Sequence, residues 1–107
     1  MARLSEAQNV LIEASVPLVN GHKVVLLDVG GRKDVPLVEY NQNIYCVDDF
    51  GNIVWQVDAP TSQFSERDSF VGVFKNKEGL LRADRFGGNE YVIDPKTGKA
   101  NYVGWHK

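Results

Sequence analysis

The sequence lacks several features that carry chemistry or mark special classes of protein. It has one cysteine in 107 residues, so it can form neither an internal disulfide nor a metal site built from thiolates. Its longest apolar run, residues 24–27, is far shorter than the roughly 18 residues that mark a membrane span. Twelve Lys and Arg against fourteen Asp and Glu leave a net charge of −2. That balance argues against non-specific nucleic-acid binding, which needs a strong basic excess.

The N-terminal residues do not have the pattern of a secretory signal. Such a signal needs a basic start, a continuous apolar stretch and a small-residue cleavage site. Polar residues interrupt any such stretch here, at Glu6, Gln8, Asn9 and Glu13. A single free cysteine is typical of a reducing compartment. We therefore expect a cytoplasmic protein without a membrane segment.

Short runs of β-branched and aromatic residues, separated by turn residues, dominate the chain. We expect nine strands, at residues 16–19, 22–29, 35–40, 44–48, 53–57, 70–74, 80–85, 90–94 and 100–105. Most connections are too short for parallel crossovers, so the strands should pair in antiparallel fashion. Asn20-Gly21 predicts a type I′ hairpin turn. The alternation of Ile53, Trp55 and Val57 predicts that these side chains face a core.

Two segments of the chain leave alternatives open. Residues 5–14 predict a short helix or turn, in which Ser5 and Gln8 form a capping box, but a long first strand over residues 9–19 is the alternative. Residues 58–69 contain no strand pattern. Loops of this length are uncommon in compact domains and often functional, although this one could also be a plain crossover between two sheets.

An internal repeat relates residues 43–57 to residues 89–103. The matched pairs are Asn43 and Asn89, Tyr45 and Tyr91, Val47 and Ile93, and Asp48 and Asp94. A turn that contains glycine follows each segment, with Gly51 in the first and Gly98 in the second. In such a turn the Asp side chain caps the backbone and the glycine supplies a positive φ.

The strand–turn–strand pattern of the repeat resembles the blades of quinoprotein-type β-propellers. Tyr91, Asp94, Thr97 and Gly98 match that pattern, and Tyr45, Asp48, Gly51 and Trp55 match it in a shortened form. The resemblance implies the hairpin shape and not the cofactor, because two blades cannot close a ring. We therefore expect one all-β domain over residues 1–107, with room for one short N-terminal helix, built as an antiparallel two-sheet sandwich or a half-propeller.

No arrangement of residues predicts catalysis, a metal site or a cofactor. The two histidines and the cysteine lack metal-ligand spacing. Cys46 lies within a strand and next to acidic residues, which would raise its pKa. Gly30-Gly31-Arg32-Lys33 lacks the spacing of a phosphate-binding loop. Asp48 and Asp49 are adjacent in an extended segment and would point to opposite faces, unlike a glycosidase pair.

The layout of charge is more informative than its total. Residues 1–38 are neutral, residues 39–68 carry a net charge of −5, and residues 69–107 carry +3. An acidic region of this kind attracts a basic partner and accelerates association. The alternative is an ordinary solvated surface. The basic residues of the last segment, Lys75, Lys77, Arg82, Arg85, Lys96 and Lys99, are too few for a typical RNA-binding surface.

In its size, expected compartment and all-β pattern, the chain resembles the small bacterial immunity proteins of contact-dependent inhibition systems. This resemblance implies a non-catalytic module that covers the cationic active site of a toxin nuclease with an acidic face. The candidate partner-binding residues are Tyr45, Asp48, Asp49, Asp58, Phe64, Glu66 and Asp68.

Two other functions are also consistent with the sequence. One is a ligand-binding or enzymatic sandwich with a pocket between the sheets, lined by Trp55, Tyr91, Tyr102 and Trp105. The other is a structural subunit whose open sheet edge completes a larger β assembly, for example a homodimer.

Overall fold

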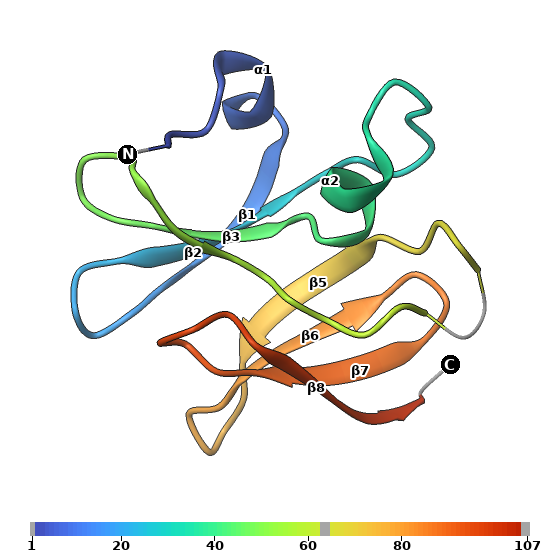
Figure 1. Cartoon of the computed structure of the whole chain (residues 1–107). Helices are drawn as coiled ribbons and strands as arrows, with labels where there is room; N and C mark the ends of the chain where they lie inside the picture. Colours follow the sequence, from blue (N-terminus) through green and yellow to red (C-terminus); the bar gives the residue numbers. More distant parts are fainter. Residues whose placement is uncertain (1, 63–64, 106–107) are drawn as a thin grey trace.

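A computed structural model describes residues 2–62 and 65–105 of the chain (Figure 1). In this part of the chain two short helices accompany eight strands. The elements are α1 (Glu6–Asn9), β1 (Ile12–Pro17), β2 (Lys23–Leu27), α2 (Leu37–Asn41), β3 (Ile44–Val47), β4 (Ile53–Gln56), β5 (Phe70–Lys75), β6 (Leu81–Arg85), β7 (Asn89–Ile93) and β8 (Ala100–Trp105). None of the helices among these residues is long and apolar enough to cross a membrane.

The strands form two antiparallel four-stranded sheets, which confirms the expected all-β, two-sheet architecture. Each sheet is a meander, with the order β1-β2-β3-β4 in sheet 1 and β5-β6-β7-β8 in sheet 2. The two halves of the internal repeat, residues 43–57 and 89–103, therefore occupy the third and fourth strands of each sheet. Strands β1 and β2 pack against β5 where the sheets meet.

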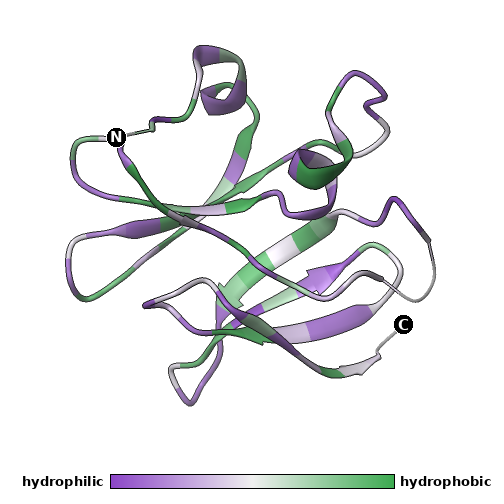
Figure 2. Cartoon of the chain, in the orientation of Figure 1, coloured by the Kyte–Doolittle hydropathy of each residue, from purple (hydrophilic) through white to green (hydrophobic). Residues whose placement is uncertain are grey.

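Sheet 1 is covered on both faces, whereas sheet 2 is covered on one. Alternate residues of β2 and β3, such as Val24 and Cys46, belong to the core between the sheets. Their neighbours, such as Val25 and Tyr45, belong to a second core beneath the N-terminal segment and α2. This double burial explains why β2 and β3 are apolar almost throughout (Figure 2). The outer face of sheet 2 instead carries an Arg82–Glu90 ion pair at 3.0 Å.

Four hairpin turns gather at one end of the molecule, on the left of Figure 1, which we call the hairpin end. They lie at residues 18–22, 48–52, 76–80 and 94–99. The turn at Asn20-Gly21 is not type I′ as predicted, because only Gly21 has a positive φ, of 88°. Residues 19–21 form a three-residue loop, which consists of a type I turn followed by Gly21. The positive φ of this glycine lets the loop follow the twist of the two strands.

The opposite end, which we call the connection end, holds the long connections between strands. The predicted strand at residues 35–40 is wrong, because helix α2 begins there after Pro36. The ring fixes the proline φ at −55°, a value suited to a helix start, and Val35 and Tyr40 pack into the second core. At the N-terminus, α1 is shorter than the predicted segment, but its Ser5–Gln8 capping box is confirmed.

Trp55 fastens the two sheets together. Its ring lies in the core between the sheets, as predicted, and its indole N–H donates to the carbonyl of Pro95 at 2.9 Å. A Cβ atom on Gly98 would lie 2.6 Å from the Trp55 ring. The second turn of the repeat therefore needs its glycine both for the backbone, with φ at 82°, and for the close approach of Trp55.

These facts predict that Gly98→Ala destabilises the protein more than Gly79→Ala does. Gly79 has nearly the same φ, 83°, but open space around the position of its Cβ. Alanine at Gly79 should cost about 1 kcal/mol for the left-handed backbone. At Gly98 overpacking against Trp55 adds about 1–3 kcal/mol. Chemical denaturation of both variants measures the difference, and equal losses would contradict the role assigned to Trp55.

Candidate partner-binding site

The seven predicted site residues do not form one face. Asp48 and Asp49 lie in the β3–β4 turn at the hairpin end, whereas Glu66 lies in the connection between β4 and β5 at the opposite end (Figure 1). Asp58 follows β4 and forms a bridge to Lys99 beside the β7–β8 turn, with its carboxylate 4.0 Å from the Lys99 ammonium. Phe64 lies outside the described residues. The prediction of a single acidic face is therefore wrong, because the meander carries neighbouring parts of the sequence to opposite ends.

Two of the predicted residues are buried and cannot contact a partner. Tyr45 is 4% exposed and lies in the second core, where burial raises the pKa of its hydroxyl. Asp68 is also 4% exposed. Its carboxylate accepts hydrogen bonds from the Gly87 N–H at 2.9 Å and the Ser62 hydroxyl at 2.5 Å. The sequence predicts both residues to bind a partner, Asp68 through its charge and Tyr45 through its ring, but both are structural.

At the connection end, three consecutive amide side chains at residues 41–43 hold the long connection in place. Each amide both donates to and accepts from backbone groups of that connection or of the start of β5, at distances of 2.7–3.1 Å. The backbone partners are Glu66 and Asp68 for Asn41, Ala59 for Gln42, and Phe70 for Asn43. The described parts of the connection, residues 57–62 and 65–69, are therefore held against sheet 1 where the chain crosses between the sheets.

Arg85 completes this network from sheet 2. Its side chain is 1% exposed, so it cannot join the basic surface that the sequence suggested. The guanidinium donates to the carbonyls of Asn41, Pro60 and Asp68 and to the hydroxyl of Tyr91. It also lies 4.4 Å from the centre of the Phe70 ring. No ion pair between described residues involves Arg85, so carbonyl dipoles and aromatic faces stabilise its charge.

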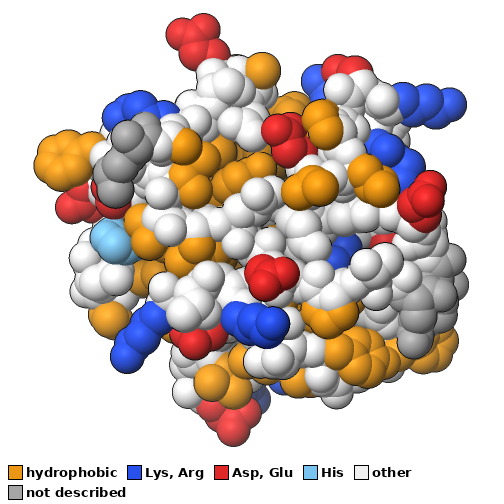
Figure 3. Space-filling model, viewed as in Figure 1, with side chains coloured by type: hydrophobic (Ala, Val, Ile, Leu, Met, Phe, Trp, Pro, Cys, Tyr) orange, Lys and Arg blue, Asp and Glu red, His pale blue; other side chains and the backbone are white. Residues whose placement is uncertain are grey.

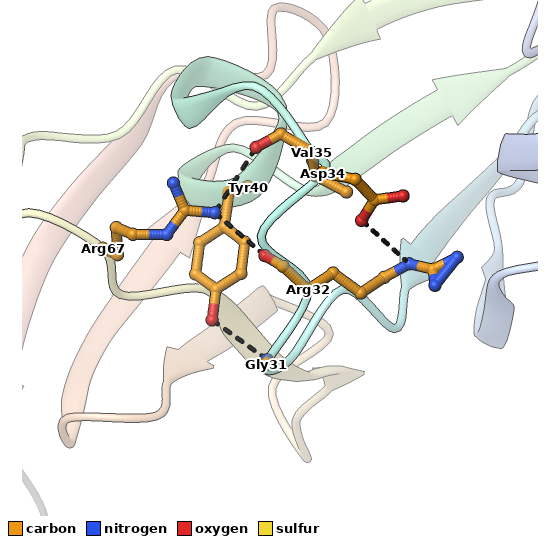
Figure 4. Close-up of polar contacts among 6 residues, drawn as sticks. All are labelled: Gly31, Arg32, Asp34, Val35, Tyr40 and Arg67. Carbon is orange, nitrogen blue, oxygen red and sulfur yellow. Dashed lines mark hydrogen bonds and ion pairs between the residues drawn. The ribbon is translucent and has the colours of Figure 1, made fainter.

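A second arginine fixes the outer side of the same connection (Figure 4). Arg67 lies 4.2 Å from the centre of the Tyr40 ring and donates to the carbonyls of Arg32 and Val35 at 3.0 and 3.4 Å. The N–H of Gly31 donates to the Tyr40 hydroxyl at 3.3 Å. The glycine-rich segment at residues 30–33 is thus tied to α2 and to the connection, and its role here is structural.

The β3–β4 turn is a rigid, acidic tip. The Oδ1 atom of Asp48 accepts hydrogen bonds from the N–H groups of Phe50 and Asn52, both at 2.9 Å. These bonds, above all that from Asn52, hold the pKa of Asp48 below its ordinary value, and His22 contributes. A lowered pKa means that the ionised carboxylate stabilises the turn at neutral pH, and that this contribution is lost only as Asp48 protonates in acid.

Phe50 stands at the end of this tip and is 75% exposed. Next to it lies Asp49, which is also exposed and has no hydrogen bond or ion pair with any described residue. We call Asp48, Asp49 and Phe50 the acidic tip. Sequence reasoning placed Phe50 in a turn but did not select it as a site residue; the signal was an aromatic residue at a position where turns favour polar ones.

A recess of about 440 Å³ lies beside the acidic tip. Its lining includes Arg3 and Lys23 as well as the tip itself. The guanidinium of Arg3 lies against Gly51, where a Cβ would approach it to 2.8 Å. Hydrophobic, acidic and basic side chains accordingly adjoin at the left margin of the molecule in Figure 3. The tip thus presents an aromatic ring and carboxylates in front of two basic groups.

The described residues contain no group of three or more side chains that could hold a metal ion. Cys46 is buried, and burial together with Asp48 raises the pKa of its thiol to about 11. The four residues of the predicted aromatic pocket between the sheets do not line one cavity. Tyr91 and Tyr102 are in edge-to-face contact, with ring centroids 6.0 Å apart, and line a small cavity of about 170 Å³ that includes neither tryptophan. Trp55 and Tyr91 are buried in the core, whereas Tyr102 and Trp105 are half-exposed on β8.

The structure predicts that Arg85→Lys destabilises the protein by about 3–5 kcal/mol, as for a buried charged group that loses its partners. A lysine cannot reproduce the planar set of donors that reaches three carbonyls and Tyr91. Arg82→Lys, on the same strand, is the control. Its pair with Glu90, in which both side chains are about a quarter exposed, should change the stability by less than about 1 kcal/mol. Urea unfolding tests both, and similar losses would contradict the role of Arg85.

The raised pKa of Cys46 predicts a thiol that resists alkylation in the folded protein. At a pH well below 11 the native protein should react with iodoacetamide at least about a hundredfold more slowly than the unfolded chain, because little thiolate forms and the sulfur is buried. Mass spectrometry of timed samples measures both rates. Rapid labelling of the native protein would show that the site opens.

A family model described as "Domain of unknown function (DUF7957)" matches residues 9–105 of the chain. No curated protein and no solved structure matches the chain.

Proposed function

The chain belongs to the DUF7957 family, and we propose that it is a non-catalytic module that binds a protein partner through the acidic tip. The observation that carries the proposal is the exposure of Phe50 at the end of a turn that Asp48 and Gly51 hold rigid. An exposed aromatic side chain on a fixed backbone loses little entropy on binding, which is why such residues dominate binding energies.

The charge of the tip favours a basic partner. Asp49 makes no ion pair with a described residue and can pair with a cation. Asp48 is charged at neutral pH, and its lowered pKa keeps it charged in more acidic solution. Arg3 and Lys23 line the recess behind the tip. Because they repel a basic partner, the attraction is confined to the tip itself. A toxin nuclease with a cationic active site is the specific partner that we propose, with Asp49 in the place of a substrate phosphate. The distant Glu66 takes no part in this contact.

Phe50→Ser and Phe86→Ser form a matched pair for testing the proposal. Both phenylalanines are strongly exposed in turns, at 75% and 82%, but Phe86 lies in the β6–β7 turn at the connection end. Tagged wild-type and variant chains would be expressed in the native cells, and the proteins recovered with them would be quantified by mass spectrometry. Phe50→Ser should reduce recovery of the partner at least about tenfold, and Phe86→Ser should leave it unchanged.

Asp49→Lys and the salt dependence test the charge of the partner. A basic partner should be recovered less well by Asp49→Lys and less well at high salt, because both changes weaken the attraction between the charges. Equal recovery by the wild-type and Phe50→Ser chains, or loss with Phe86→Ser alone, would overturn the proposal. Thermal unfolding of each variant verifies that the fold is intact.

A further inference from the structure

A groove of about 430 Å³ lies where the hairpin end of sheet 1 meets that of sheet 2. The β1–β2 turn forms one wall and the β5–β6 and β7–β8 hairpins form the other. Apolar side chains and two lysines line the groove. Its volume is in the range of sites that accept a drug-sized ligand or a large side chain.

The chemistry of the groove is apolar with a basic rim. Leu81 and Ile93 are buried core residues at its floor, while Val19 and Leu80 are exposed on its walls. Lys75 and Lys96 are the charged residues in the lining, and neither makes an ion pair with a described residue. The groove therefore suits an apolar side chain that has carboxylates next to it.

The acidic tip of the same chain has this chemistry. Phe50 supplies a large, exposed apolar ring, and Asp49 beside it supplies a carboxylate that pairs with none of the residues 2–62 and 65–105. Both the tip and the groove lie at the hairpin end, but they belong to different turns, so one molecule presents the two features side by side. A second molecule that faces the first across a two-fold axis at this end could exchange both contacts at once, as isologous dimers do.

We propose that two copies of the chain associate through their hairpin ends, each placing Phe50 in the groove of the other and Asp49 against Lys75 and Lys96. Each contact buries an exposed aromatic ring on apolar side chains and pairs opposite charges, and the symmetry doubles the gain. The inference rests on the proposed function in one respect: the dimer covers the acidic tip, so self-association and binding of a basic partner exclude each other.

Sedimentation velocity over a wide range of concentrations tests the dimer. The wild-type chain should show a monomer–dimer equilibrium, and Phe50→Ser should raise its dissociation constant at least about tenfold. Phe86→Ser and Lys33→Glu, both at the connection end, should leave it unchanged. A wild-type chain that stays monomeric, or a dimer that Phe50→Ser does not weaken, would overturn the proposal.

A charge exchange separates the specific contact from any effect on folding. Asp49→Lys alone, and Lys75→Glu with Lys96→Glu alone, each place like charges at both contacts of the dimer. Each should therefore weaken self-association at least about tenfold. Mixing the two variants restores opposite charges at both contacts, so a heterodimer should form within about threefold of the wild-type affinity. Failure of the mixture to associate would overturn the assignment of the tip to the groove.

Measuring how much partner each variant recovers distinguishes a failure of the dimer from a failure of the proposed function. The Lys75→Glu, Lys96→Glu chain retains the whole acidic tip, so it should be monomeric and recover at least as much partner as the wild type. If the wild type is monomeric while Phe50→Ser loses the partner, the dimer is disproved and the proposed function stands. If the dimer forms as described while Phe50→Ser retains the partner, the proposed function fails and the dimer stands.

Discussion

The structure of the connection end depends on the hydrogen bonds that the buried guanidinium of Arg85 donates. A buried cation needs partners, and here three backbone carbonyls, the Tyr91 hydroxyl and the ring of Phe70 supply them. Those carbonyls come from α2, from the connection between the sheets and from its junction with β5. Ordering one side chain therefore orders three segments that are distant in sequence. The amides at residues 41–43 satisfy the remaining backbone groups of the same segments.

Because of this polar network, the two ends of the molecule differ in how many polar side chains are engaged in contacts within the protein. At the connection end, side chains such as Asn41, Arg67 and Asp68 are occupied by the protein itself. At the hairpin end the backbone of each turn is closed by its own short hydrogen bonds and a glycine, so several side chains remain free. Phe50, Val19 and Leu80 are exposed there, and Asp49 makes no ion pair within the described part of the chain. Phe86 is exposed at the connection end as well, but it lies beside Arg67 and Asp68, whose polar groups the protein itself occupies. The hairpin end combines exposed apolar side chains with a carboxylate that no described residue pairs, and it is therefore the better candidate for recognition.

The acidic tip and the lysine-rimmed groove lie at the same end of the molecule. In the proposed dimer, the groove of a second copy therefore competes with the basic partner for the acidic tip. A surface that recognises a basic partner through Asp49 and Phe50 can also recognise any apolar groove with a basic rim, and this chain carries such a groove. Exchange between a self-associated and a partner-bound form would then depend on relative affinity, without a change in the fold.

By itself, the sequence determined the features that depend on local chemistry. Strand alternation placed Trp55 in the core, the capping box located α1, and Asp-to-Gly spacing located the turns at Asp48 and Asp94. Only the tertiary structure decided which polar residues are free. Asp68 and Arg85 became internal and Phe50 external, because burial depends on contacts between segments far apart in the chain. The tertiary structure also separated Asp48 from Glu66, because successive connections of a meander lie at opposite ends of its sheet. The net charge of a sequence segment does not show where its residues lie in space.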